Sequence, residues 1–523
     1  MNRRSFLTRW LTRPSFTIDY HAAPARPAAA GLDPYVPGGD APWDALRAGH
    51  LLRRATFLPR WSDIETLLGL SPSQAVDLLL TTASTPARPD VADHVTESLD
   101  GLDPTLQNQL RTVWADDKQK LAQWWAETMR DAGLTIVEKM TAFWSGHFTT
   151  EFETDDVNVV APLLYRQNQL FREKGLGSFR DLVMAITLDG AMLVYLGGDL
   201  NNAGAPNENY ARELLELFTT GLGHYTEGDV QNAARILTGW RSARFDDKPA
   251  PNGMFNTHFQ PNMHDIGAKE FLGVSFAARD NSTNTEFLVQ RDEVRRLVDT
   301  IFDKRPRAVA EFISRKIYSF FVYSNPGESD QGVIEAMADV FIHNDFEIKP
   351  LMAALLKSRH FFDNANIGAQ IKTPMEFEIG LARQMGGSLD LVDDLGRLDQ
   401  ELFDPPNVSG WPGYREWITT TTYPIRSEIA AQVVSSMKDN VLVDLIRSFP
   451  NHTDVAELVK NAAAILLPRP LSAERSASLK AKLLAGAPDY EWGEILTNSP
   501  STAARNMRDM LTTVAELPDF QLC

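Results

Sequence analysis

Two histidines and three carboxylates of the kinds that bind metals or transfer protons stand in short polar motifs of this sequence. They are His147, Glu213, Glu216, His264 and Asp265. Glu213 and Glu216 are three residues apart, so on a helix their carboxylates lie on neighbouring turns of one face. Imidazole and carboxylate groups are ligands of zinc, iron and manganese. The first prediction is a divalent-metal site whose ligands are His147, Glu213, Glu216 and His264.

The same groups also suit acid–base chemistry without a metal. Two ionisable groups in unlike environments can divide the roles of proton donor and proton acceptor, as they do in glycoside hydrolysis. The second prediction makes Glu213 the acid or base and His264 or Asp265 its partner. An aromatic ring in an irregular loop can stack on a sugar. The residues predicted to contact the substrate are Trp411, Asn209 and Arg212.

A purely structural explanation of these charges stays open. In this alternative, the glutamates around residue 213 form salt bridges with Arg212, Arg235 or Arg241 and carry out no chemistry. Trp411 would then close a core instead of binding a ligand. The sequence contains no Walker loop, no GxSxG motif and no dinucleotide-binding motif, which disfavours nucleotide-dependent and serine-hydrolase chemistry.

A helical hairpin between Pro206 and Trp240 must position the central carboxylates. At 100° per residue, the first helix has an apolar arc and an opposite arc of charged and amide side chains. Gly221 and Gly223 are predicted to end this helix. Thr226 is predicted to cap the second helix, with Asp229 as the acidic member of a capping box. The prediction is a hairpin with one apolar face and one face rich in carboxylates.

Composition limits the classes of function. The chain has 523 residues, 43% of them hydrophobic, and a net charge of −18, which disfavours a nucleic-acid binder because such proteins need a basic face. Its single cysteine, Cys523, cannot form an internal disulfide or a cysteine-based metal site. No apolar run approaches the length that crosses a bilayer, so no integral membrane segment is expected.

The hairpin and six further motifs resemble a bacterial family called domain of unknown function 1800. The hairpin carries NENYARELLELFTTGLG and YTEGDVQNAARILTGW. The other motifs are HLLRRATF (50–57), FWSGHF (143–148), MHDIGAKEFLG (263–273), FISRKIYSFFV (312–322), KTPMEF (372–377) and PPNVSGWPG (405–413). All five metal or acid–base candidates occupy these motifs. The family pattern commonly has a histidine where this chain has Phe218, so that position supplies no ligand here.

The resemblance implies a cellular setting but no reaction. Members of the family are commonly exported and often encoded beside a sulfatase-like companion, the domain of unknown function 1501 family. Arg3-Arg4-Ser5-Phe6-Leu7 is similar to a twin-arginine export motif, although the apolar segment that should follow is missing. Periplasmic or extracellular location is the expectation, and a cytoplasmic protein with a basic tail is the alternative.

The helical pattern predicts a mainly α fold. Residues 1–42 form a basic tail and a Pro/Ala-rich linker, residues 43–423 a multihelical core that carries the motifs, and residues 424–523 a C-terminal helical region. Near 241–279 the helical period fails, which predicts a small β-hairpin or irregular flap. Two functions follow as hypotheses: a hydrolase-like enzyme acting on a polymeric or glycan-like substrate, or a non-catalytic scaffold that binds the sulfatase-like companion through its charged face.

Overall fold

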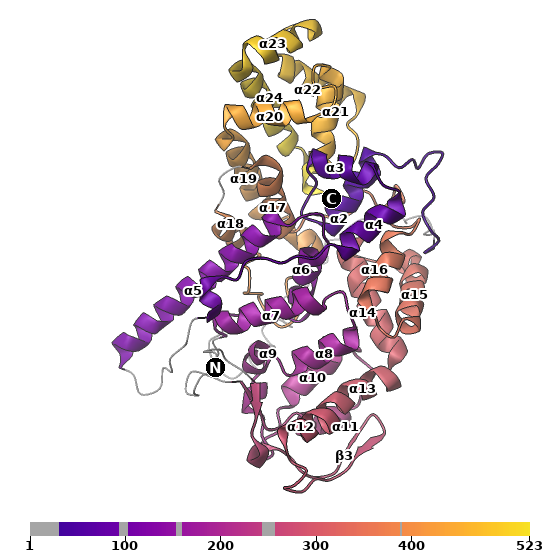
Figure 1. Cartoon of the computed structure of the whole chain (residues 1–523), viewed down its shortest axis with the longest axis vertical. Helices are drawn as coiled ribbons and strands as arrows, with labels where there is room; N and C mark the ends of the chain where they lie inside the picture. Colours follow the sequence, from indigo (N-terminus) through magenta and orange to yellow (C-terminus); the bar gives the residue numbers. More distant parts are fainter. Residues whose placement is uncertain (1–30, 94–102, 153–158, 243–256, 387–389) are drawn as a thin grey trace.

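The regular structure is helical apart from two small antiparallel sheets. The computed structural model describes residues 31–93, 103–152, 159–242, 257–386 and 390–523. Figure 1 shows helices in every part of the molecule. The predicted fold class, a mainly α body with a small β insert near 241–279, is confirmed. Most of the predicted N-terminal tail and linker, residues 1–30, lies outside the described residues.

Local capping residues set the helix boundaries in the first half of the chain. At α4, the Ser71 hydroxyl accepts from the backbone N–H of Gln74, and the Gln74 side chain accepts from the Ser71 N–H, so the predicted start of this helix is confirmed. The helices of this half are α2 (Ala45–Ala55), α3 (Trp61–Leu68), α4 (Pro72–Thr81), α5 (Pro104–Asp131), α6 (Val137–His147), α7 (Ala161–Lys174), α8 (Phe179–Thr187), α9 (Gly190–Tyr195), α10 (Glu208–Glu216) and α11 (Glu227–Ile236).

The second half continues the helical pattern after the β insert. A short π-helical segment, Gln290–Val294, lies between α12 and α13. The helices are α12 (Glu286–Val289), α13 (Arg295–Lys304), α14 (Pro306–Phe321), α15 (Glu328–His343), α16 (Ile348–Leu356), α17 (Pro374–Met385), α18 (Leu391–Arg397), α19 (Thr422–Ser436), α20 (Asp439–Ser448), α21 (Val455–Leu466), α22 (Ala473–Leu484), α23 (Trp492–Asn498) and α24 (Pro500–Ala515). Among the helices of the described ranges, none is long and apolar enough to span a bilayer.

The β insert consists of two separate hairpins. Strand β1 (Trp240–Ser242) pairs with β2 (Thr257–Phe259), with Arg241 opposite His258. Strand β3 (Lys269–Phe271) pairs with β4 (Val274–Phe276). The strands are three residues long, so each hairpin depends on packing against the helices for its stability.

One apolar core extends from the first helices to the last. It contains Leu51 of α2, Leu214 and Leu215 of α10, and Leu458 of α21. In Figure 1 the helices after residue 423 gather at one end of the long axis, next to α2 and α3. Apolar packing therefore crosses the boundary predicted at residue 423, and the division into two domains at that point stays a prediction.

Buried arginines of α2 bond to the C-terminal ends of distant helices. Arg53 donates to the carbonyl oxygens of Ala464 and Leu467 at the end of α21. Arg54 donates to the carbonyls of Phe320 and Phe321 at the end of α14. The last carbonyls of a helix have no partner within the helix and carry partial negative charge, which a guanidinium satisfies. The motif HLLRRATF thus joins α2 to two helices far away in sequence.

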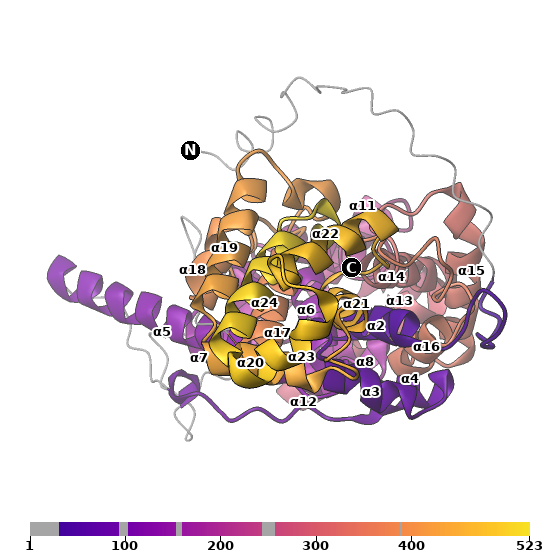
Figure 2. The ribbon, with the colours of Figure 1, turned by 90° about the horizontal axis from the view of Figure 1, so that it is seen from above.

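Helix α5 projects from the body. Figure 2 shows its N-terminal half extending beyond the other helices, while its C-terminal half packs against them. Its 28 residues correspond to a length of about 42 Å. Trp125 near its C-terminal end is fully buried, whereas Leu106 and Val113 are exposed.

Candidate functional site

The hairpin of α10 and α11 forms as predicted, with a later start. The Asn207 side chain accepts from the N–H of Tyr210, so the helix begins at Glu208 and Pro206 lies outside it. Thr226 and Asp229 form the predicted capping box at α11. Tyr210, Leu214 and Leu215 are buried in the core. The polar arc of α10 therefore faces away from the core, as its sequence requires.

Side chains of the turn after α10 and of α14 bond to the carbonyl groups at the end of α10. The hydroxyls of Thr219 and Thr220 donate to the carbonyls of Leu214 and Leu215 at 2.7 and 2.9 Å. These bonds end the helix at Glu216, before Gly221 is reached. The Leu217 carbonyl lies 3.4 Å from Nζ of Lys316 on α14.

His147, at the end of α6, is another side chain that bonds to a backbone carbonyl next to α10. Its Nε2 lies 3.1 Å from the carbonyl oxygen of Phe218, and its ring is 3% exposed. Phe143, Phe148 and Phe312 surround the ring. Burial, and to a lesser degree the charge of Lys316, holds the pKa of His147 well below its ordinary value. The imidazole is therefore neutral and donates from Nε2, while Nδ1 has no hydrogen-bond partner among the residues that the structure describes.

Glu213 differs from the other acids of α10 in its environment. It is half-buried, and burial together with the charge of Glu216 raises its pKa to about 7, against the opposing effect of Arg212. Its side chain makes no hydrogen bond or ion pair with any residue that the structure describes. The salt bridge considered as a structural alternative does not form here, because Arg212 pairs with Glu227 at 2.6 Å.

Tyr195 and Glu151 extend this environment beyond α10. The Tyr195 hydroxyl donates to Oε2 of Glu151 at 3.3 Å. Burial and then the charges of Glu151 and Glu213 raise the pKa of Tyr195 above its ordinary value. The pKa of Glu151 is also raised, by burial and by Asp404. Tyr195 is therefore influenced by acids from three segments of the chain, Glu151, Glu213 and Asp404.

Sequence analysis missed Tyr195, Glu151 and Asp404. Glu151 follows the FWSGHF motif closely, so its nearness to that motif was a usable signal. Tyr195 ends the apolar helix α9, and nothing in that pattern indicates a contact with carboxylates.

Glu216 makes a further tyrosine contact on the polar arc of α10. Oε2 of Glu216 accepts from the hydroxyl of Tyr225 at 2.8 Å, in the turn between the two helices. Burial raises the pKa of Tyr225 to about 12, and the bond to Glu216 acts in the same direction. Glu216 is therefore held by Tyr225, whereas Glu213 has no such partner among the described residues.

His264 and Asp265 lie together, in a separate network. Nδ1 of His264 lies 2.9 Å from the carbonyl oxygen of Thr238, and its Nε2 lies 3.5 Å from Oε2 of Glu293. Asp265 accepts two hydrogen bonds from Arg235, at 2.7 and 3.2 Å. No hydrogen bond or ion pair of the described residues connects Glu213 with His264 or Asp265. The pairing of these residues as acid and base therefore stays a prediction.

Glu293 is the carboxylate on which this second network converges. It accepts from Lys269 at 2.8 Å and from Arg279, in addition to its contact with His264. These contacts lower the pKa of Glu293 although its burial acts in the opposite direction. Glu293 lies in the π-helical segment, which no sequence pattern indicated. The MHDIGAKEFLG motif thus holds the β3–β4 hairpin against α12 and α13.

The loop that carries Trp411 packs on the end of α6. Gly410 has a φ of +85°, and a Cβ there would lie 2.8 Å from the carbonyl oxygen of Gly146. Thr149 donates to the carbonyl of Val408. This close approach requires glycine at position 410. Trp411 is consequently held beside the helix end that carries His147, with its ring half-buried.

The remaining predicted contacts have different surroundings. Asn209 is exposed on the polar arc of α10, and Arg212 is engaged with Glu227 on α11. No hydrogen bond or ion pair between described side chains joins His147 to Glu213; His147 instead contacts the backbone at Phe218, just after α10. In the described ranges, no group of three or more His, Cys, Asp or Glu side chains is placed to hold a metal ion. The predicted metal site therefore stays a prediction. Its proposed ligands are His147, Glu213, Glu216 and His264.

Comparison with known proteins identifies the family of the chain. No curated protein and no solved structure shows a significant match. One family model matches residues 50–522, and it is described as "Protein of unknown function (DUF1800)". These residues include the second half of α2, the α10–α11 hairpin, the β insert and all helices of the C-terminal region. The chain therefore belongs to the DUF1800 family.

Proposed function

We propose that this protein is a hydrolase-like enzyme in which Glu213 transfers protons. The observation that carries the proposal is a half-buried carboxyl with a pKa of about 7 and no partner among the described side chains. A general acid or base works best when its pKa lies near the working pH. Asp265 and Glu293, by contrast, each have a cation beside them.

The proposed roles follow from the surroundings of Glu213. The charge of Glu216, one turn away, favours the protonated form of Glu213 until a reacting group removes its proton. Tyr195 and Glu151 supply a second hydroxyl–carboxylate pair next to this group. The proposed substrate contacts are Trp411, through its ring, and Asn209 and Arg212 on the polar arc. A polymeric or glycan-like substrate is proposed because an aromatic ring can stack on a sugar and two carboxyl groups can divide the acid and base roles.

The decisive variant is Glu213→Gln, which keeps the size of the side chain and removes the ionisable group. The substrate is sought first, by measuring release of reducing ends from a panel of polysaccharides with the wild-type protein. Glu213→Gln is expected to abolish turnover without destabilising the folded protein. Glu208→Gln, on the same helix, is the matched control and is expected to keep the activity. Full activity of Glu213→Gln would contradict the proposal.

Export is part of the proposed function. A polymeric substrate would be met outside the cytoplasm, and the twin-arginine-like motif at Arg3-Arg4 supports the same location. Cell fractionation of the wild type and of an Arg3→Lys, Arg4→Lys double variant tests this directly. Loss of the periplasmic or extracellular pool in the double variant is expected, whereas an equal cytoplasmic pool in both would favour the cytoplasmic alternative.

The projecting part of α5 favours a second candidate function, a non-catalytic partner of the sulfatase-like companion. Leu106 and Val113 are 44% and 51% exposed on a helix that leaves the body (Figure 2). Exposed apolar side chains on such a helix suit burial against another protein. Co-purification of the two proteins, lost in a Leu106→Glu, Val113→Glu double variant, would support this function. Retained binding in that variant would place the interface elsewhere.

A further inference from the structure

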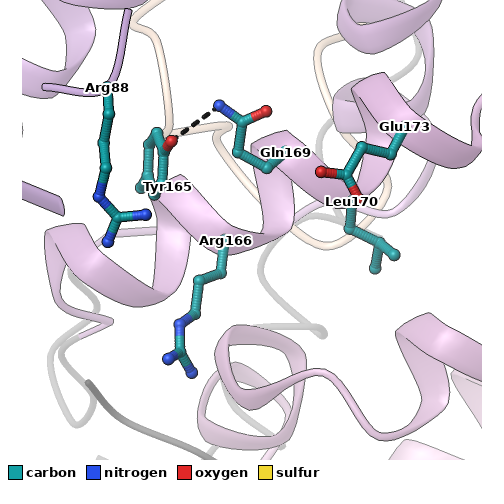
Figure 3. A pocket seen from close by; sticks show the side chains of 6 residues that line it. All are labelled: Arg88, Tyr165, Arg166, Gln169, Leu170 and Glu173. Carbon is teal, nitrogen blue, oxygen red and sulfur yellow. Dashed lines mark hydrogen bonds between the residues drawn. The ribbon is translucent and has the colours of Figure 1, made fainter. Parts of the chain in front are cut away.

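The amine of Lys316 on α14 differs from the cations of a pocket along α7 in how its charge is satisfied. The pocket has a volume of about 420 Å³, and its lining residues are Arg88, Tyr165, Arg166, Gln169, Leu170 and Glu173 (Figure 3). Both arginines of this lining are engaged with other groups of the protein. Lys316, by contrast, forms no ion pair with any residue that the structure describes.

Two other buried lysines show what the fold usually supplies to such a group. Lys139 donates to Glu376, and Nζ of Lys269 lies 2.8 Å from Oε2 of Glu293. Removing an ammonium group from water is costly unless a carboxylate compensates its charge. Lys316 lacks this compensation. Burial lowers the pKa of Lys316 to about 8, and no carboxylate of the described residues opposes this effect.

The amine of Lys316 is weakly held and lies near solvent. Its Nζ lies 3.4 Å from the Leu217 carbonyl oxygen, beyond the usual length of an N–H···O hydrogen bond. The same atom lies 4.9 Å from the centroid of the Phe312 ring. Lys316 and Phe312 are both partly exposed, so the two side chains present surface to solvent together. Lys372, which also lacks a carboxylate partner, is fully buried and donates to the carbonyl of Phe520 at 2.6 Å.

The Phe312 ring forms an apolar wall beside this amine. Its centroid lies 6.3 Å from that of the His147 ring. Gly221 brings the turn after α10 against the same ring, because a Cβ at this position would lie 3.1 Å from a ring carbon. His147 is neutral, so it adds no charge that would hold the lysine in its protonated form. Apolar surroundings favour the neutral amine, which is the form that acts as a nucleophile.

We propose that Lys316 is a nucleophilic amine that forms an imine with the carbonyl group of an aldehyde whose apolar body packs against Phe312. The Nζ lone pair attacks the carbonyl carbon, and the electron pair of the C=O bond moves to the oxygen. Transfer of the two nitrogen-bound protons to that oxygen releases water and leaves a C=N bond. The step needs no oxidant or reductant. It goes beyond the function proposed for Glu213 and does not depend on it.

Reductive trapping tests this amine in the full-length protein. The protein is incubated with benzaldehyde and sodium cyanoborohydride at pH 7.5, and the modified peptides are quantified over time by mass spectrometry. Lys316 is expected to react about tenfold or more faster than Lys460, a lysine of α21 whose side chain is 68% exposed. The reason is that a pKa of about 8 leaves a substantial neutral fraction of the Lys316 amine at this pH. Unfolding in urea should remove the preference, because the burial that causes it is lost.

The pH dependence of trapping distinguishes a nucleophile from a lysine that only caps α10. The rate at Lys316 is expected to level off above about pH 8, whereas an ordinary exposed lysine gains neutral amine up to about pH 10. Lys316→Arg keeps a cation beside α10 and should lose only the product trapped at this position. Lys460→Arg is the matched control and should keep that product.

Two results would contradict the proposal. Trapping at Lys316 no faster than at Lys460 in the folded wild-type protein would overturn it, and this measurement needs no variant. A ratio of trapping at Lys316 to trapping at Lys460 that is larger with glyceraldehyde, a polar aldehyde, than with benzaldehyde would overturn the apolar contact with Phe312.

Discussion

Nε2 of His147 lies 3.1 Å from the carbonyl oxygen of Phe218, so the histidine of the FWSGHF motif binds the end of the helix that carries Glu213. A neutral imidazole in this position satisfies a buried carbonyl that has no partner within its helix. The contact links α6 to α10 and gives His147 a structural role that holds with or without a metal.

The first prediction concerns this contact. His147→Phe removes the donor and leaves the Phe218 carbonyl buried without a partner, which should cost about 1 to 3 kcal/mol of the free energy of unfolding. The folded pKa of His147 is depressed, so its contribution to stability is lost as the pH falls below the unfolded value near 6.5. Urea denaturation at pH 7 and pH 5 measures both effects. A stability difference between variant and wild type that is larger at pH 5 than at pH 7 would be inconsistent with a neutral imidazole.

The second prediction concerns the ionisation of Glu213. Its folded pKa of about 7 is above the ordinary 4.5, so the folded state favours the protonated form. Stability from this group is complete below pH 4.5 and is lost as the pH rises towards 7. Glu213→Gln should therefore be more stable than the wild type at pH 8, by about 1 to 2 kcal/mol after allowing for solvent screening, and equal to it at pH 4. Denaturation curves at both values test this without any substrate.

The third prediction concerns Glu293, the carboxylate that pairs with Lys269 and Arg279. Glu293→Gln leaves two buried cations without their counter-charge and should destabilise the fold by about 3 to 5 kcal/mol. Asp265→Asn, which breaks the half-exposed pair with Arg235, should cost less. Thermal melting of the two variants shows which substitution destabilises the protein more. Equal and small losses would show that the ions of the insert are not essential to its packing.

The fourth prediction concerns Glu378 on α17. Its side chain is fully buried, neither carboxyl oxygen has a partner among the described residues, and burial together with Asp394 raises its pKa to about 8. The folded state therefore binds this proton more tightly than the unfolded chain, and stability falls as the pH rises from about 4.5 to 8. Glu378→Met should remove this loss, which amounts to at most about 5 kcal/mol above pH 8. Denaturation at pH 6 and pH 9 measures the free energy of unfolding of the wild type and of the variant. If the variant loses as much stability between pH 6 and pH 9 as the wild type does, the prediction is refuted.

The fifth prediction concerns the loop that holds Trp411. Gly410→Ala forces a side chain into a positive φ and against the Gly146 carbonyl, so it should destabilise the protein by about 1 kcal/mol or more and displace the tryptophan. Gly396→Ala is the control, because a Cβ there meets nothing within 4 Å and its φ is not positive. The fluorescence of the tryptophans and the melting temperature report on both variants. A neutral Gly410→Ala would mean that the loop adjusts without strain.

Elements with strong local patterns were predictable from the sequence. Ser71 and Thr226 each begin a helix because the hydroxyl accepts from the N–H three residues later, and the side chain of that later residue accepts from the N–H of the capping residue. The failure of the helical period near 241–279 correctly placed the β insert. In these places one short stretch of chain decides its own conformation.

The site was less predictable because it depends on contacts between distant segments. Asp265 lies in a polar motif, but its pairing with Arg235 follows from the packing of the insert on α11. Tyr195 reaches Glu151 only because α9 and the segment after α6 meet in the fold. The π-helical segment that presents Glu293 has no sequence pattern of its own. Glu213 was identified by spacing, whereas its unusual pKa comes from burial that spacing does not reveal.

The arginines of α2 have a consequence for how the protein is made. Arg53 emerges early from the ribosome, yet its acceptor Leu467 is synthesised 414 residues later. At a synthesis rate of about 5 to 20 residues per second, the carbonyl of Leu467 is made at least about twenty seconds after Arg53. Contacts this remote in sequence also slow the search for the native state. A chain truncated before α21 would lack the carbonyl groups to which the buried guanidinium of Arg53 donates. Such a chain would be a substrate for chaperones and proteases.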